Sequence, residues 1–209
     1  MDPVLAVLGI LGALFIGVIS PGPSFVLVAR TAIAVSRRDG LAAAAGMGLG
    51  GVFFGALALA GLTAVLASVE WLYLGLRVLG GAYLVYLGVA IWRGATQKIV
   101  VTATADGTAN PARSFMLALT TQVSNPKTAI VYASVFAALL PPSLPGWIYI
   151  VLPLLIFAIE TSWYAVVALL FSAERPRAAY LHSKIWIDRL AGAVMGLLGL
   201  RLIAETVRG

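Results

Sequence analysis

The feature that most constrains this chain is the sequence Ser-Pro-Gly-Pro-Ser at residues 20–24, inside an apolar run that extends from about residue 3 to residue 35. Roughly 20 residues cross a bilayer as one helix, so this run is too long for one straight span. Proline lacks a backbone N–H and clashes with the preceding turn, so two prolines and a glycine interrupt the helix. Unwound backbone at membrane depth is tolerated only where protein or a water-filled cavity satisfies it. The sequence therefore predicts a broken first span, and the break is either an internal site or a packing kink.

A second interruption of similar form lies in a later apolar run, where residues 124–127 read Ser-Asn-Pro-Lys. Aligning Ser20 with Ser124 also aligns Ser24 with Thr128, so polar side chains flank both interruptions. Matching interruptions in two halves of a chain are typical of transporters whose binding site is built from discontinuous helices.

Composition places the chain in a bilayer, because 61% of its 209 residues are hydrophobic and only 11% are charged. Soluble domains contain about 25% charged residues. We predict an all-α integral membrane protein with six transmembrane helices arranged as two inverted three-helix repeats, with spans 1 and 4 broken. The first repeat is expected at 1–93, a cytoplasmic linker loop at 94–112, and the second repeat at 113–209. The last span is expected at about 187–207, after a charged connection at 172–186.

The basic residues orient the spans. Most Lys and Arg residues lie in or beside the first, third and fifth connections, whereas the second and fourth connections contain none. Cytoplasmic loops carry the excess of Lys and Arg, so both termini are expected outside the cytoplasm. Three spans in each half insert the two halves with opposite orientation, as in many secondary transporters.

Two ionisable residues fall well inside the expected spans, Lys127 directly after the second interruption and Glu160 near the middle of the fifth span. Such residues are costly in lipid and usually face a cavity on a transport path. Lys127 is expected to balance a carboxylate, and Glu160 is a candidate proton carrier. The alternative is a Lys127–Glu160 ion pair that only stabilises the fold.

The helix ends created by the interruptions also bear on function. A helix N-terminus has free N–H groups and partial positive charge, which suit a carboxylate. The helices that restart near Ser24 and Thr128 each offer one. A zwitterionic substrate would then find anion donors there and an acid at Glu160.

Other function classes have little support in the sequence. The chain contains no Cys and one His, His182, so a thiol nucleophile, a thiolate metal site and a multi-histidine metal site are excluded. We expect no enzyme, no metal and no cofactor, and the few basic residues between spans do not indicate nucleic acid. Small-xxx-small pairs such as Gly46/Gly50 and Gly51/Gly55 suit close helix packing within the chain or between copies, which leaves a homodimer open.

Four segments together resemble the LysE/RhtB family of amino-acid exporters. They are Ser20-Pro21-Gly22-Pro23, Arg37-Arg38-Asp39-Gly40-Leu41, the sequence Gly-Gly-Ala-Tyr-Leu-Val-Tyr-Leu-Gly at 80–88, and Asn125-Pro126-Lys127.

The resemblance implies a bacterial inner-membrane exporter of amino acids or close derivatives, driven by proton exchange. The family's two motifs map onto residues 21–23 and 125–127. Members often carry an acidic residue in span five, which would be Glu160, although aspartate is the commoner residue there. Arg77 stands where members commonly have a basic residue.

The function predicted from these observations is export of amino acids from the cytoplasm by proton antiport, with an amino acid, protons and the lipid bilayer as partners. The alternatives are export of another small solute, such as an ion or an amine, and a membrane scaffold subunit. The residues expected to form the transport site are Pro21, Gly22, Pro23, Ser24, Asn125, Pro126, Lys127 and Glu160.

Overall fold

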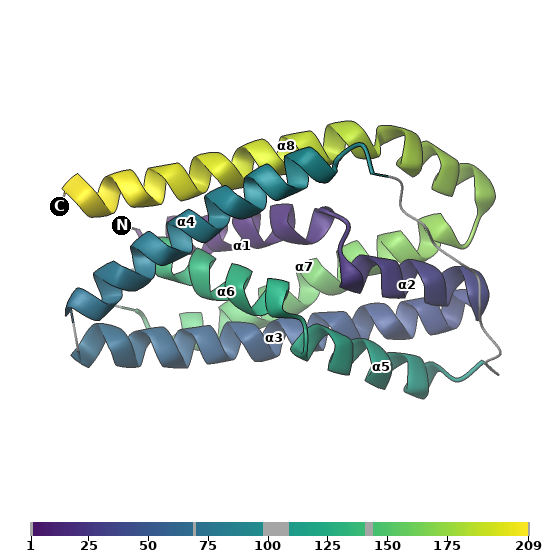
Figure 1. The fold of residues 1–209 in the computed structure, drawn as a ribbon. Coiled ribbons are helices and arrows are strands. Elements are labelled where there is room, and N and C mark those ends of the chain that lie inside the picture. The colour runs from purple at the N-terminus through teal and green to yellow at the C-terminus, as the bar shows by residue number, and fades with distance from the viewer. Residues whose placement is uncertain (1, 69, 98–108, 141–143, 209) are drawn as a thin grey trace.

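The computed structural model describes residues 2–68, 70–97, 109–140 and 144–208, and all the regular secondary structure in these ranges is helical. The helices are α1 (Pro3–Ile19), α2 (Pro23–Ala34), α3 (Arg37–Ser68), α4 (Glu70–Gly94), α5 (Pro111–Val123), α6 (Pro126–Leu139), α7 (Ile148–Phe171) and α8 (Glu174–Arg208). They form an elongated bundle with both termini at the same end (Figure 1).

Several of these helices are long and apolar enough to span a membrane. Among the described residues, four qualify by length and composition: α3 over Arg37–Gly61, α4 over Leu74–Gly94, α7, and α8 over Glu174–Val207. The pair α1 and α2 qualifies together and is bent by 59° at its break, which makes up to five spans. The predictions of an all-helical membrane protein and of a broken N-terminal span are confirmed.

Prolines start helices at both interruptions. Pro23 lies in the first turn of α2, and Pro126 begins α6 directly after α5 has ended at Val123. The first turn of a helix tolerates proline because the N–H there has no intrahelical partner. Asn125 caps α6 by accepting a hydrogen bond from the backbone N–H of Lys127 at 3.0 Å. Each interruption is therefore a stop and a restart, not a bend within one continuous helix.

The predicted start of the last span, at about residue 187, is not a helix boundary. The helix α8 starts at Glu174 and continues without a break into the apolar segment. An ion pair between Lys184 and Asp188, one helical turn apart at 2.7 Å, crosses the expected boundary and supports continuous helix. Of the expected linker loop at 94–112, residues 98–108 lie outside the described residues.

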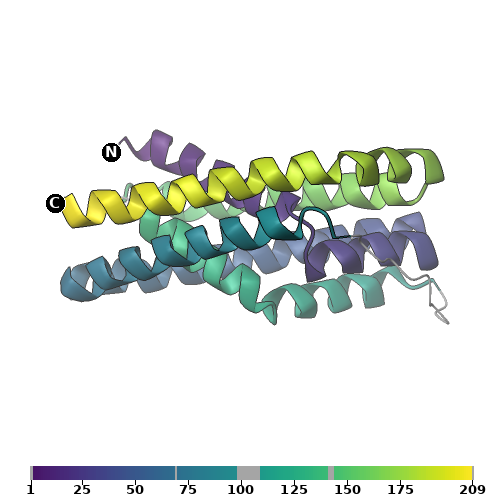
Figure 2. The ribbon, with the colours of Figure 1, turned by 45° about the horizontal axis from the view of Figure 1, so that its top comes forward.

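Two of the motifs that support the family resemblance have packing roles. The fully buried carboxylate of Asp39 accepts hydrogen bonds from the Ser114 hydroxyl at 2.8 Å and the Asn110 N–H at 3.0 Å, which ties the start of α3 to the start of α5. In α4, a Cβ added to Gly88 would lie 2.5 Å from the carbonyl oxygen of Gly192 in α8. The glycines therefore let α4 and α8 lie side by side within one chain, as both views show (Figures 1 and 2).

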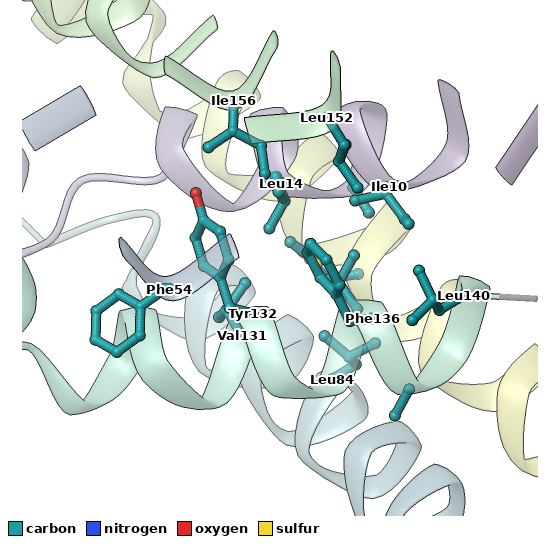
Figure 3. Close-up of a cluster of buried hydrophobic side chains, with 14 of the residues drawn as sticks. Ile10, Leu14, Phe54, Leu84, Val131, Tyr132, Phe136, Leu140, Leu152 and Ile156 are labelled. Atoms are coloured by element: carbon teal, nitrogen blue, oxygen red, sulfur yellow. The ribbon is translucent and has the colours of Figure 1, made fainter. Parts of the chain in front are cut away.

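Two hydrophobic clusters fill the bundle at different levels. The first is built on α1, α3, α4, α6, α7 and α8 and includes Leu14, Tyr132, Phe136 and Ile156 (Figure 3). The second lies towards the other end, on α2, α3, α5, α7 and α8, and includes Phe25 and Tyr164. Both helix breaks fall between these clusters.

Candidate functional site

The two helix breaks meet inside the bundle. The side-chain amide of Asn125, at the second break, donates a hydrogen bond to the hydroxyl of Ser24, in the first turn after the first break, at 3.1 Å. A cavity of about 30 Å³ lies between them and is lined by Ser20 and Gly22 from the first break and by Asn125 and Lys127 from the second. This volume holds about one water molecule, so the cavity is too small for any larger solute in this conformation. We call it the closed cavity for this reason.

A continuous chain of hydrogen bonds runs from this junction to Glu160. The Ser24 hydroxyl donates to Oε1 of Gln122 at 2.6 Å, and Nε2 of Gln122 donates to Oε2 of Glu160 at 3.0 Å. The Tyr132 hydroxyl donates to Oε1 of Glu160 at 2.7 Å. With Asn125, the chain joins side chains from α2, α5, α6 and α7 and the second break. Among the labelled residues of Figure 3, Tyr132 alone carries a polar atom on its side chain.

Glu160 is completely enclosed, with 0% of its surface exposed. Both carboxyl oxygens are engaged by neutral donors, and no ion pair joins Glu160 to Lys127 within the part of the chain that the structure describes. The ion-pair alternative is therefore wrong for this conformation. A buried carboxyl with neutral partners can hold a proton in one state and release it in another, provided that a conformational change gives it access to water.

Small residues of α3 make room for this polar layer. A Cβ added to Gly51 would lie 2.6 Å from Oε2 of Glu160 and 2.8 Å from the Tyr132 hydroxyl. At Gly50 it would lie 2.6 Å from the Gln122 side chain. The glycine spacing that indicated helix packing in the sequence therefore also provides the space that the carboxyl group occupies.

A larger, open cavity of about 450 Å³ lies on the other side of the breaks, and we call it the vestibule. It is lined by Ser20, Pro21, Gly22, Pro23, Val26, Leu87, Ala90, Ile91, Gly94, Gln97, Lys127, Lys184 and Asp188. Ser20, Gly22 and Lys127 also line the closed cavity, so these residues form the boundary between the two spaces. The vestibule is in the size range of small-molecule sites.

The vestibule wall on α8 is fixed by a buried lysine. Nζ of Lys184 donates hydrogen bonds to Oδ2 of Asp188 at 2.7 Å and to the carbonyl oxygens of Gly94 and Ala95 at 3.3 and 3.1 Å. Lys184 thereby holds α8 against the end of α4.

The structure brings the predicted site residues to one region, although not to one cavity. Residues 21–23 and Lys127 line the vestibule, whereas Ser24 and Asn125 line the closed cavity and Glu160 lies beyond it. Pro126 lines a separate surface pocket with Pro23. Arg77 is not part of the site, because it pairs with Glu205 near the C-terminus at 3.8 Å.

Sequence reasoning missed Gln122, Tyr132, Lys184 and Asp188. Gln122 and Tyr132 meet Glu160 across 38 and 28 residues, and one sequence contains no signal for such pairing. Lys184 and Asp188 have the spacing of a helical ion pair, but the predicted boundary put Lys184 in the connection and Asp188 in the last span. Within the described residues, no group of three or more His, Asp or Glu side chains could hold a metal ion.

Comparison with known proteins identifies the family of this chain. The family model described as LysE type translocator matches residues 15–206. The threonine efflux protein of Escherichia coli (strain K12) is 33% identical over 190 residues, which cover 90% of this chain and 92% of that protein. An uncharacterized membrane protein of the same strain, YahN, is 30% identical over 99% of this chain and 93% of its own length.

A more distant relative carries a different substrate in its name. The leucine efflux protein of Klebsiella pneumoniae is 28% identical over 90% of this chain and 88% of that protein. No solved structure is a significant match to this chain. The helical membrane fold, the two meeting helix breaks and the match over most of the chain lead to one conclusion: this protein belongs to the LysE-type translocator family of amino-acid efflux proteins.

Proposed function

We propose that this protein exports a neutral amino acid from the cytoplasm in exchange for protons. The observation that carries the proposal is the junction of the two helix breaks, where a closed cavity and an open vestibule share Ser20, Gly22 and Lys127. Discontinuous helices that meet at an internal site are the usual construction of a secondary transporter. The relatives named for threonine and leucine efflux suggest the substrate class, with threonine as the first candidate.

The same proposal includes six spans in two inverted repeats. In it, α1 with α2 forms the first broken span and α5 with α6 the fourth, so that residues 1–93 and 113–209 are equivalent halves joined by the linker at 94–112. Figure 1 supports this interpretation, because α5 and α6 follow one another along the bundle as α1 and α2 do. The positive-inside rule then puts both termini outside the cytoplasm.

The two cavities suggest which state of the transport cycle this conformation represents. The vestibule is bounded by Gly94 and Gln97, beside the third connection between spans, which the basic residues assign to the cytoplasm. Towards the end with the termini, the first hydrophobic cluster packs across the bundle beyond Tyr132. The cavity of about 370 Å³ beside Tyr132 and Phe136 is lined almost entirely by apolar side chains of α3, α4 and α6, and we do not interpret it as a path for a polar substrate. We therefore interpret the vestibule as the cytoplasmic entrance, with the outward path closed.

In this scheme Lys127 and Glu160 have separate tasks. Lys127 attracts the carboxylate of the entering amino acid at the boundary between vestibule and closed cavity. Glu160 carries the proton, and the chain through Gln122 and Ser24 couples its protonation to the junction of the breaks. Movement of one half against the other at the breaks then exposes the site to the opposite side.

The test is efflux from proteoliposomes loaded with radiolabelled threonine or leucine, with and without a pH gradient. We expect gradient-dependent efflux that falls at least tenfold in Lys127→Ala and persists in Arg93→Ala, a change of an exposed cation that lines neither cavity. Absence of efflux for every amino acid, from correctly inserted protein, would contradict amino-acid export. Efflux at the same rate with and without the pH gradient would contradict proton antiport but not amino-acid export.

A further inference from the structure

We propose that Asp188 binds the ammonium group of the exported amino acid in the vestibule, opposite Lys127, which binds its carboxylate. The inference rests on the proposed export of amino acids and deepens it, because it assigns the two charged ends of the substrate to two named side chains. Asp188 was not among the residues expected from the sequence.

The first argument is a carboxylate oxygen without a partner. Asp188 is only 3% exposed, and its Oδ2 accepts the hydrogen bond from Lys184. Its Oδ1 is buried and has no hydrogen-bond partner among the described residues. An unsatisfied buried polar atom costs about 1–3 kcal/mol, so proteins seldom keep one without a use for it. Asp188 lines the vestibule, so a small rotation of its side chain would turn Oδ1 towards a ligand there that donates hydrogen bonds.

The second argument is the opposite charge in the same cavity. Lys127 lines the vestibule too, and within the described residues no hydrogen bond or ion pair engages its Nζ. Lys127 and Asp188 line the same cavity, and among the described residues they do not form an ion pair with each other. An α-amino acid carries an ammonium and a carboxylate on one carbon, and it can bridge two such side chains.

The third argument is the uncapped start of α2. Its N-cap residue is Gly22, which has no side chain to bond the first amides of the helix. Lys127 lies beside the same residue, because a Cβ added to Gly22 would be in ordinary contact with Nζ at 3.4 Å. The positive end of α2 and the Lys127 ammonium therefore favour a carboxylate at one place.

Glu160 cannot take the ammonium in this conformation. It is fully enclosed, both of its oxygens already accept hydrogen bonds, and the cavity between it and the vestibule holds about one water molecule. The titratable groups that interact with Asp188 are Lys184, Lys127 and Tyr180. The Tyr180 hydroxyl is also buried with no hydrogen-bond partner in the described part of the chain. In this proposal the carboxylate that binds the substrate, Asp188, lies at the vestibule, and the carboxyl group that carries the proton, Glu160, lies deeper in the bundle.

The experiment compares amino acids with analogues in which a hydroxyl replaces the ammonium. The probes are threonine against 2,3-dihydroxybutanoate, and leucine against 2-hydroxy-4-methylpentanoate, tested as competitors of labelled amino-acid efflux in proteoliposomes. We expect the wild-type protein to prefer the ammonium form at least tenfold. Asp188→Asn should abolish that preference, because an amide does not attract a cation as a carboxylate does.

Two further variants separate recognition from folding. Lys184→Gln removes the partner of Asp188 but keeps the carboxylate, so it should weaken α8 anchoring and retain the tenfold preference. Asp188→Asn leaves the buried Lys184 charge uncompensated, so the double variant Lys184→Gln/Asp188→Asn is measured beside it and should also lack the preference.

The outcomes distinguish the inference from the function on which it rests. If Asp188→Asn inserts correctly and prefers the ammonium form as strongly as the wild type does, Asp188 does not bind the ammonium group. Amino-acid export would stand in that case. A wild type that binds both members of each pair equally overturns it as well. A wild type that exports no amino acid overturns the proposed function, and the inference with it.

Discussion

Glu160 and Asp188 are two buried carboxyl groups in one membrane protein, and their surroundings differ in every respect except burial. Glu160 is 0% exposed and Asp188 is 3% exposed. Glu160 has a neutral donor on each oxygen and lies behind a closed cavity. Asp188 has a lysine on one oxygen, no hydrogen-bond partner among the described residues on the other, and an open vestibule beside it.

This difference teaches that burial alone does not assign a role to an intramembrane acid. A buried carboxyl group with neutral donors and no cation beside it can take a proton to remove its charge, once one of its donors turns away. A carboxylate with one empty acceptor and a cavity in front of it is suited to a ligand that brings donors and positive charge. The number of hydrogen-bond partners of the carboxyl group, and the cavity beside it, indicate its role better than its exposed fraction does.

The largest effect is expected from Glu160→Gln. The amide keeps the size of the side chain, but it cannot carry a proton, and its NH₂ group would face either the Gln122 donor or the Tyr132 hydroxyl. We expect export to fall at least tenfold while insertion and yield stay normal. Initial efflux rates with a pH gradient check this, and an unchanged gradient-dependent rate would remove Glu160 from the proton path.

The next-largest effect is expected from a change in the packing of α8, the helix that carries Asp188. In Gly88→Ala, the new Cβ would lie 2.5 Å from the Gly192 carbonyl oxygen and 2.6 Å from the Gly196 nitrogen, both backbone atoms that cannot move aside. Such overpacking costs about 1–3 kcal/mol, and we place this change at the upper end because α4 and α8 must separate.

Thermal unfolding in detergent measures that cost, with Gly75→Ala in the same helix as the matched control, because a Cβ at Gly75 meets nothing within 4 Å. Equal stability of the two variants would show that the α4–α8 contact is looser than described. A selective loss of the preference for ammonium-bearing substrates, in protein that remains folded, would link this contact to Asp188.

The sequence predicted the parts of this arrangement that depend on local chemistry. Two prolines with a glycine, and an Asn-Pro pair, stop a helix wherever they occur, so both breaks were found within a few residues. Lys127 and Glu160 stood out because charge is rare in apolar segments.

The partners of these residues depend on tertiary contacts and could not be predicted. Asn125 reaches Ser24 across 101 residues, and nothing in either neighbourhood announces the pairing. The α8 boundary failed for a different reason. The charged residues at 172–186 were interpreted as a connection, whereas α8 is continuous from Glu174 and buries the charged side chain of Lys184. Charge in a membrane protein marks a connection only when no partner within the bundle neutralises it.

A smaller effect is expected on the Glu160 side from Gly51→Ala. The added methyl group would press on the Glu160 carboxyl and the Tyr132 hydroxyl, which are ends of side chains and can shift. We expect a loss of about 1–2 kcal/mol and a several-fold fall in export. Gly12→Ala, on an exposed helix position where a Cβ meets nothing within 4 Å, should be neutral or stabilising. Export in Gly51→Ala equal to that in Gly12→Ala would show that the carboxyl position is not critical.

The smallest effect is expected from Ser24→Ala, which cuts the chain two links away from the carboxyl group. It removes the donor to Gln122 and the acceptor for Asn125, while the bonds from Gln122 and Tyr132 to Glu160 remain. The two lost hydrogen bonds leave buried atoms of Gln122 and Asn125 without this partner, which costs about 1–3 kcal/mol of stability. The effect on export is the smallest of the series, because both oxygens of Glu160 keep their donors. Ser172→Ala, which removes only an exposed bond to the Leu169 carbonyl, is the control and should change stability little.

If Ser24→Ala lowers the unfolding temperature but leaves gradient-dependent export unchanged, the chain between the breaks and Glu160 is structural. A loss of gradient dependence without a loss of stability would instead make Ser24 part of the coupling between substrate and proton.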